Sequence, residues 1–181
     1  GGEAQGDILT AIENLSGSQG NDTLIGSAGA NTLQGWNGGD VLRGGAGADR
    51  LEGGAGVDTA SYYGSNAPVS VDLSTGKGSG GHAQGDTLIS IENLSGSAGS
   101  DTLIGSAGAN ALQGWSGGDV LRGGAGADRL DGGEGADTAS YHASSAAVSV
   151  DLSTGKGSGG DAQGDVLISI ENLSGSSGND R

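Results

Sequence analysis

Residues 17–61 read GSQGNDTLI-GSAGANTLQ-GWNGGDVLR-GGAGADRLE-GGAGVDTAS, which is five nonapeptides in tandem. Each nonapeptide starts with six mostly small, Gly-rich residues that end in Asp or Asn, a composition suited to turns with positive φ. The last three residues carry one aliphatic side chain in the middle: Leu24, Leu33, Leu42, Leu51 or Ala60. Because side chains alternate along a strand, only this middle residue would face inward. Such short strands are expected to stack on identical neighbours, as in a solenoid.

The same pattern returns at a fixed spacing. Asp7, Asp86 and Asp165 each close an AQGD tetrapeptide, and the differences 86−7 and 165−86 both give a period of 79 residues. We interpret the chain as a piece of a longer array that forms one continuous solenoid. Its segments are the end of a connector half-turn (1–16), nonapeptide run 1 (17–61), a β-helical connector (62–95), run 2 (96–140), a second connector (141–174) and the start of a third run (175–181).

The connectors are expected to continue the same course. Residues 68–73 and 87–91 alternate apolar and polar side chains, and a polar loop, 74–86, lies between them. We therefore expect two half-turns from each connector and seven per unit of 79 residues. Because seven is odd, equivalent residues such as Trp36 and Trp115 should lie on opposite edges of the solenoid.

The composition excludes several classes of protein. There is no Cys, which removes disulfides and thiolate metal sites. There is also no apolar run of about 18 residues, so membrane insertion is not expected. The net charge of −15 disfavours nucleic acid as a partner. His82 and His142 lie outside the nonapeptides and form no Ser/His/Asp constellation, so we expect no catalytic function and no enzyme.

Stacking identical turns would place Asp carboxylates in columns about 4.8 Å apart. Asp22, Asp40 and Asp58 would share one column, while Asn31 and Asp49 would share the other. Like charges at that spacing repel one another unless a cation lies between them. A hard cation with oxygen ligands fits, because Gly-rich turns also offer their carbonyl groups. An Asx-turn, in which each Asp caps its own backbone, is the alternative role for these side chains.

The nonapeptides GGAGADRLE (44–52) and GGAGADRLD (123–131) resemble the GGxGxDxUx repeat of the RTX (repeats-in-toxin, hemolysin-type) calcium-binding family. The resemblance covers ten complete nonapeptides, or 90 of the 181 residues. It implies an all-β fold, a right-handed parallel β-roll or β-helix solenoid with two nonapeptides per coil. It also implies Ca²⁺ in the turns, between half-turns n and n+2.

The resemblance implies a set of metal ligands for each pair of turns. Side-chain ligands would come from Asp22, Asn31, Asp40, Asp49, Asp58, Asp101, Asn110, Asp119, Asp128 and Asp137. The earlier turn would add carbonyls from its second and fourth residues, and the later turn from its first and third. These are Ser18, Gly20, Ser27, Gly29, Gly35, Trp36, Asn37, Gly38, Gly44, Ala46, Gly53 and Ala55 in run 1, and Ser97, Gly99, Ser106, Gly108, Gly114, Trp115, Ser116, Gly117, Gly123, Ala125, Gly132 and Glu134 in run 2.

Some positions depart from the family pattern. Asn31 and Asn110 replace Asp and should weaken their two sites. Asp86 and Asp165 could pair with Asp58 and Asp137, which would raise the expected number of calcium ions from six to eight. Glu13, Glu92 and Glu171 recur in IENL, where a turn or edge hydrogen bond is expected rather than a metal ligand. For Trp36 and Trp115 we expect packing at the edge of the solenoid rather than sugar stacking.

The sequence thus predicts a calcium-binding structural module of a secreted bacterial protein that folds on Ca²⁺ binding outside the cell. Export by a type I secretion system, with a secreted, extracellular or cell-surface location, is what the family implies. Two other functions stay open. The chain could be an adhesin, surface-layer or carbohydrate-targeting interaction module, or a C-terminal secretion or folding appendage of a secreted enzyme.

Overall fold

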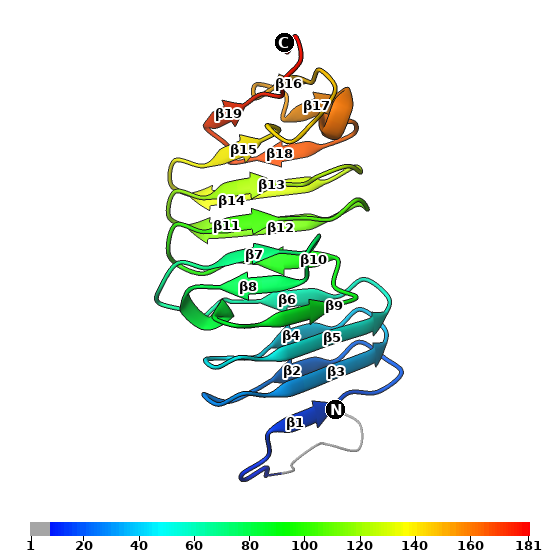
Figure 1. Ribbon diagram of the computed structural model, residues 1–181, viewed down its shortest axis with the longest axis vertical. Coiled ribbons are helices and arrows are strands. Elements are labelled where there is room, and N and C mark those ends of the chain that lie inside the picture. The colour runs from blue at the N-terminus through cyan, green and yellow to red at the C-terminus, as the bar shows by residue number, and fades with distance from the viewer. Residues whose placement is uncertain (1–7) are drawn as a thin grey trace.

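A computed structural model describes residues 8–181, which form two sheets of short strands stacked along one axis (Figure 1). The first AQGD tetrapeptide and the start of the predicted connector half-turn 1–16 lie outside the described residues. Among the described residues, no helix is long and apolar enough to cross a membrane.

Each nonapeptide contributes one strand. Run 1 and the residues before it form β1 (Asn14–Ser16), β2 (Thr23–Ile25), β3 (Thr32–Asn37), β4 (Val41–Arg43), β5 (Arg50–Ala55) and β6 (Thr59–Ser61). Run 2 forms β11 (Thr102–Ile104), β12 (Ala111–Ser116), β13 (Val120–Arg122), β14 (Arg129–Glu134) and β15 (Thr138–Ser140).

The connectors contain further strands and a short 3₁₀-helix each. The first forms β7 (Ser70–Asp72), β8 (Lys77–Ser79), η2 (Gly81–Ala83), β9 (Thr87–Ile89) and β10 (Asn93–Ser95). The second forms β16 (Ser149–Asp151), β17 (Lys156–Ser158), η3 (Gly160–Ala162), β18 (Val166–Ile168) and β19 (Asn172–Ser174).

Within the runs, every strand pairs in parallel with the strand two nonapeptides later. Leu24 lies opposite Leu42, and Leu33 lies opposite Leu51, an offset of 18 residues in each case. Successive strands alternate between a ten-stranded and a nine-stranded sheet. The expected all-β parallel roll, with two nonapeptides per coil, is therefore confirmed.

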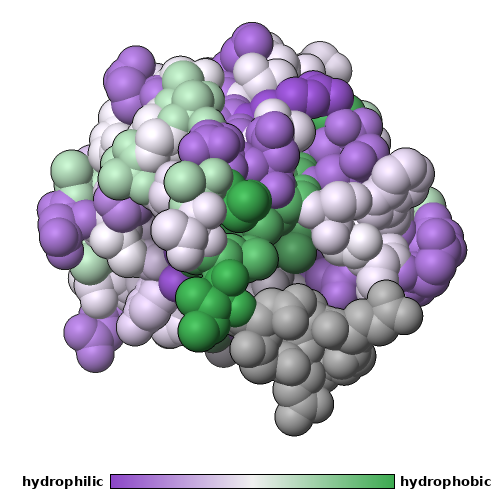
Figure 2. Space-filling view, turned by 90° about the horizontal axis from the view of Figure 1, so that it is seen from below, coloured by the Kyte–Doolittle hydropathy of each residue, from purple (hydrophilic) through white to green (hydrophobic). Residues whose placement is uncertain are grey.

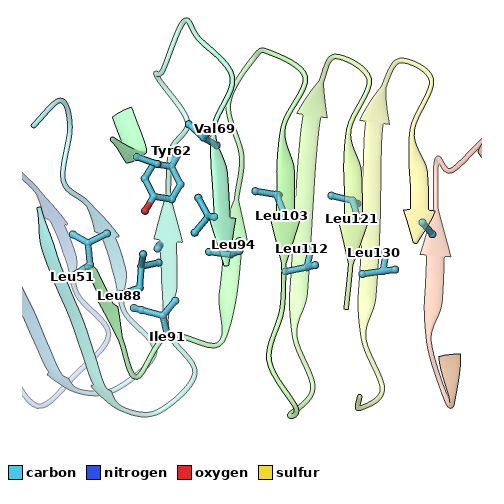
Figure 3. Packing of buried hydrophobic residues seen from close by; sticks show 14 of the residues in the cluster. Leu51, Tyr62, Val69, Leu88, Ile91, Leu94, Leu103, Leu112, Leu121 and Leu130 are labelled. Carbon is cyan, nitrogen blue, oxygen red and sulfur yellow. The ribbon is translucent and has the colours of Figure 1, made fainter. Parts of the chain in front are cut away.

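The middle residue of each strand forms the core. Figure 3 shows Leu103, Leu112, Leu121 and Leu130 reaching from alternate sheets into the space between them. Each of these side chains is at most 1% exposed. Burial of one such Leu contributes roughly 1.5–3 kcal/mol. At the N-terminal end the core is open to solvent, and apolar atoms lie there inside a polar rim (Figure 2).

The first connector departs from the predicted course. After β6, the chain enters the ten-stranded sheet at β7, turns back antiparallel through β8 and ends this excursion at β9, beside β5. It then adds the single strand β10 to the other sheet, between β6 and β12. The expectation that 68–73 and 87–91 supply successive half-turns, joined by a polar loop, is wrong. They lie in one sheet, and the second half-turn is β10.

Local turn chemistry explains the excursion. Asp72 Oδ1 accepts a hydrogen bond from the Ser74 N–H at 2.8 Å, and Gly76 has φ of 64°, which together close a hairpin between β7 and β8. Gly80 and Gly81, with φ of 74° and 45°, then reverse the chain before β9. An alternating apolar pattern specifies which face is buried, but it does not specify the partner strand.

The odd number of half-turns is nevertheless present. Trp36 lies in β3 of the ten-stranded sheet, whereas Trp115 lies in β12 of the nine-stranded sheet, so the predicted exchange of sides is confirmed. The first connector adds three strands to the ten-stranded sheet but one to the other, and the second connector does the reverse. Figure 3 shows the result, because the strands of run 1 fan away from those of run 2.

Candidate metal sites in the turns

The turns fall into two classes that differ in how the Asp or Asn side chain is used. In turns with Ser at the second position, the side chain is bonded within its own turn. Asp101 Oδ2 accepts from the Ser97 N–H at 2.6 Å, and the Ser97 hydroxyl donates to Asp101 Oδ1 at 2.7 Å. Asn31 Oδ1 likewise accepts from the Ser27 N–H. These turns are the Asx-type caps that were the alternative role for the aspartates.

In turns with Gly or Trp at the second position, that residue has positive φ, as in Gly45 (98°) and Trp36 (82°). The Asp carboxylate accepts no hydrogen bond from its own turn. Its Oδ1 instead accepts the backbone N–H two half-turns earlier: Asp40 from Asp22, Asp58 from Asp40, and Asp137 from Asp119, at 2.7–2.8 Å. These bonds link the aspartates into the predicted columns.

The second oxygen of each of these carboxylates has no hydrogen-bond donor. The buried, unpartnered atoms are the Oδ2 of Asp40, Asp49, Asp58, Asp119, Asp128 and Asp137, and each residue is at most 2% exposed. A buried carboxylate oxygen without a partner is costly. Each of the six is the later member of one predicted calcium pair: Asp22/Asp40, Asn31/Asp49, Asp40/Asp58, Asp101/Asp119, Asn110/Asp128 and Asp119/Asp137.

Backbone carbonyl groups approach these orphaned oxygens where the first Gly of the turn has no side chain. A Cβ on Gly35 would lie 2.2 Å from Asp40 Oδ2 and 2.6 Å from the Gly53 carbonyl oxygen. In run 2, a Cβ on Gly114 would lie 2.1 Å from Asp119 Oδ2 and 2.5 Å from the Gly132 carbonyl oxygen. Carboxylate and carbonyl oxygens are the ligands that Ca²⁺ prefers, so the donor set fits this ion.

The remaining predicted carbonyl ligands lie in the same turns. Two of them already accept a backbone hydrogen bond, Ala55 from Gly38 at 3.0 Å and Glu134 from Gly117 at 2.9 Å. A carbonyl oxygen has two lone pairs, so this bond does not exclude metal binding. Among the described residues, no three His, Asp or Glu side chains gather around one point. Any site is therefore built from one or two carboxylates and the backbone.

Burial raises the pKa of several of these carboxyl groups. The pKa of Asp119 is raised to about 6, mainly by desolvation and further by the charges of Asp101 and Asp137. Desolvation raises the pKa of Asp128 to about 7, and the nearby Asp165 adds to the effect. The pKa values of Asp49 and Asp58 are raised for the same principal reason. The ionised columns are therefore unfavourable without a compensating cation.

Asp86 and Asp165 have different partners from those expected. Asp86 Oδ1 accepts from the Asp49 N–H at 2.8 Å, and Asp165 Oδ1 accepts from the Asp128 N–H at 2.9 Å. The expected pairs Asp58/Asp86 and Asp137/Asp165 are wrong, because β9 and β18 lie beside β5 and β14.

The second oxygens of these two carboxylates also have donors. The Tyr62 hydroxyl donates to Asp86 Oδ2 at 3.2 Å, and the Tyr141 hydroxyl donates to Asp165 Oδ2 at 3.0 Å. Both carboxylates therefore lack the free oxygen that marks the six turns of the runs.

Glu92 and Glu171 occupy the Asp slot beside Asp58 and Asp137. Glu92 Oε2 accepts from the Asp58 N–H, and Glu171 Oε2 from the Asp137 N–H, both at 2.9 Å. These are the hydrogen bonds that the sequence predicts for IENL, but their place in the aspartate columns was missed. The signal was available, because ENL (92–94) and DTL (101–103) both put a carboxylate directly before a strand.

Asn31 and Asn110 lie in the columns as expected. The Asn31 Nδ2 donates to the Glu13 carbonyl at 3.0 Å, and the Asn110 Nδ2 donates to the Glu92 carbonyl at 2.6 Å. Each amide thus replaces a charge by a donor that is already used. Their pairs with Asp49 and Asp128 contain one carboxylate instead of two.

Comparison with known proteins gives the family to which these turns correspond. The model of the RTX calcium-binding nonapeptide repeat matches the chain in four copies, at residues 10–42, 37–61, 90–121 and 116–139. Together these matches cover 10–61 and 90–139, which is more than half of the chain. No curated protein matches the chain significantly.

Replacement of Asp40 by Asn tests the orphaned oxygens. Asp40→Asn keeps an acceptor for the Asp22 N–H but replaces the unpartnered oxygen by an amide nitrogen. We expect the calcium concentration at half-folding, followed by circular dichroism, to rise about tenfold, because Ca²⁺ affinity follows ligand charge. Asp22→Asn should have a smaller effect, because Asp22 Oδ2 already accepts from the Ser18 N–H. Equal shifts in the two variants would contradict this assignment.

The raised pKa values predict that acid partly replaces calcium. In the metal-free fold the carboxyl groups of Asp119 and Asp128 have pKa values of about 6 and 7, above 3.8 for the unfolded chain. The folded state therefore takes up protons first, and its stability rises as the pH falls from about 7 to 4. In excess chelator, the β signal in circular dichroism should increase over this range. Asp128→Asn should reduce the pH dependence, and a constant or falling signal would contradict it.

Proposed function

The chain belongs to the family of RTX calcium-binding nonapeptide repeats, and from this we infer that it is a structural module that folds as it binds about six calcium ions. The observation that carries this proposal is the set of six buried carboxylate oxygens without a donor. Each lies beside a backbone carbonyl of the same turn column or the peptide units that flank it. A divalent cation would supply the positive charge that these oxygens lack.

Each ion would be held between half-turns n and n+2, by the Asp or Asn pair and carbonyl groups of the two turns. The protein's own residues position these ligands: the strand pairing sets the 18-residue spacing, and Oδ1 of each Asp is fixed by a backbone N–H. The ion itself would supply charge neutralisation. Six divalent ions would reduce the net charge from −15 to −3.

Folding would depend on these ions because the nonapeptides have little else to stabilise them. Each buries one aliphatic side chain, while ordering its Gly-rich backbone costs conformational entropy. Metal binding and folding are therefore coupled. Extracellular calcium modules bind at about 10⁻⁴–10⁻³ M, so the chain would remain unfolded in a low-calcium cytosol.

The proposed setting follows from the family rather than from the geometry. We propose that the module is part of a secreted bacterial protein, leaves the cell unfolded through a type I secretion system, and folds outside. Its role would be structural rather than catalytic. His142 supports this, because its ring contacts the Arg122 guanidinium at 3.3 Å and the Ser140 hydroxyl at 3.1 Å and faces no acidic partner.

Calcium titration tests the coupling of binding and folding. In chelator at pH 7, the chain should show a coil-like spectrum and an expanded radius. Millimolar Ca²⁺ should produce a β spectrum and a compact radius, whereas equal Mg²⁺ should not, because Mg²⁺ demands octahedral geometry and dehydrates reluctantly. A chain that is already compact in excess chelator at pH 7 would refute the proposal.

The number of bound ions distinguishes the runs from the connectors. Native mass spectrometry at saturating Ca²⁺ should find six ions per chain, because Tyr62 and Tyr141 already donate to Asp86 and Asp165. Eight ions would assign sites to the connector aspartates as well. Fewer than five would contradict the calcium columns.

A further inference from the structure

Two exposed aromatic rings meet on the outside of the solenoid, where run 1, the first connector and run 2 join. Tyr63 follows β6, and Trp115 lies in β12. Their ring centroids are 5.1 Å apart, and the ring planes differ by 52°. Tyr63 is 54% exposed and Trp115 is 39% exposed, so both rings keep a large accessible surface. Packing at the edge, the role expected from the sequence, leaves this surface unexplained.

Trp115 is held in place despite an unfavourable backbone conformation. Its φ is 81°, in the region where the equivalent residues of neighbouring turns, Gly124 and Gly133, need no side chain. A bulky residue there is strained, and such strain points to a role for the side chain. The indole Nε1 donates to the Ser95 hydroxyl at 2.8 Å, which fixes the ring. The aromatic surface is therefore preorganised.

Arg43 adds a polar group beside the rings. Its guanidinium carbon lies 5.7 Å from the centroid of the Tyr63 ring, in cation–π contact. The Arg43 Nε is buried and has no hydrogen-bond acceptor in the described part of the chain. The cluster thus combines two apolar ring faces with a hydrogen-bond donor.

We propose that Tyr63, Trp115 and Arg43 bind one ring of a neutral saccharide, a function separate from calcium binding. A pyranose ring has an apolar C–H face that packs on an aromatic ring, and its hydroxyl oxygens accept hydrogen bonds from a guanidinium. The angle of 52° between the aromatic planes prevents both from lying flat under one extended surface. The negative net charge disfavours nucleic acids and acidic saccharides.

The chain provides its own control for this site. Trp36 occupies the same nonapeptide slot, has the same positive φ and donates to the Ser16 hydroxyl at 2.7 Å. Among the described residues it has no aromatic neighbour. In the second unit, His142 stands where the first has Tyr63, and it contacts Arg122. The chain should therefore bind one saccharide.

Saturation-transfer NMR on the calcium-loaded chain tests the proposal, with maltotriose, cellotriose and triacetylchitotriose as probes. We expect transfer to the ring protons of at least one probe and quenching of tryptophan fluorescence, with millimolar affinity. Tyr63→Ala and Trp115→Gly should each weaken binding roughly tenfold. Trp115→Gly relieves the strained φ, so loss of binding in this variant would not follow from misfolding. Trp36→Gly should bind as the unsubstituted chain does.

The calcium midpoint of each variant, followed by circular dichroism, is measured first, so that a failure of calcium-dependent folding is seen separately. If none of the three probes shows transfer at saturating Ca²⁺, the proposal is overturned. Equal weakening by Trp36→Gly and Trp115→Gly would also overturn it. Binding of a proline-rich peptide in place of the saccharides would assign the rings to protein recognition instead.

Discussion

The buried carboxylate oxygen that lacks a donor is the constraint on which the rest of the solenoid depends. Each turn of the Gly-Gly or Gly-Trp class uses one Asp oxygen to hold the backbone of the coil below, and this bond draws the other oxygen into the interior. The same stacking that gives the Leu ladder its burial therefore creates the charge problem. A divalent cation resolves it without changing the chain path, because its other ligands are backbone carbonyl groups already in the turn.

The connectors meet the same stacking requirement with other chemistry. The second oxygen of Asp86 has the Tyr62 hydroxyl, and the slot above Asp58 is filled by Glu92. The first connector also contributes larger buried side chains, such as Val69 and Ile91, and its strands β7, β8 and β9 pair with one another. The array thus alternates calcium-dependent runs with joints that satisfy their carboxylates internally.

The runs could be predicted from the sequence because one period determines both pairing and burial. The nine-residue repeat places Leu24 over Leu42, and no other register buries the middle residue of every strand. The connector could not be predicted in the same way. Its alternating segments can be buried in either sheet, and the choice depends on the Gly76 and Gly80 reversals, which direct β9 back beside β5. The wrong partner for Asp86 follows from that single step.

The odd number of half-turns has a consequence for the surface as well as for the core. Arg43 lies in β4 of the nine-stranded sheet, whereas its equivalent, Arg122, lies in β13 of the ten-stranded sheet. The extra strands of the two connectors are likewise inserted in opposite sheets, so that the bend introduced by the first is opposed by the second. Two consecutive units therefore keep one axis while presenting equivalent surfaces on opposite faces. A residue such as Trp115 can then acquire partners that Trp36 lacks, although both occupy the same position of the repeat, because its neighbours come from the joint below rather than from its own run.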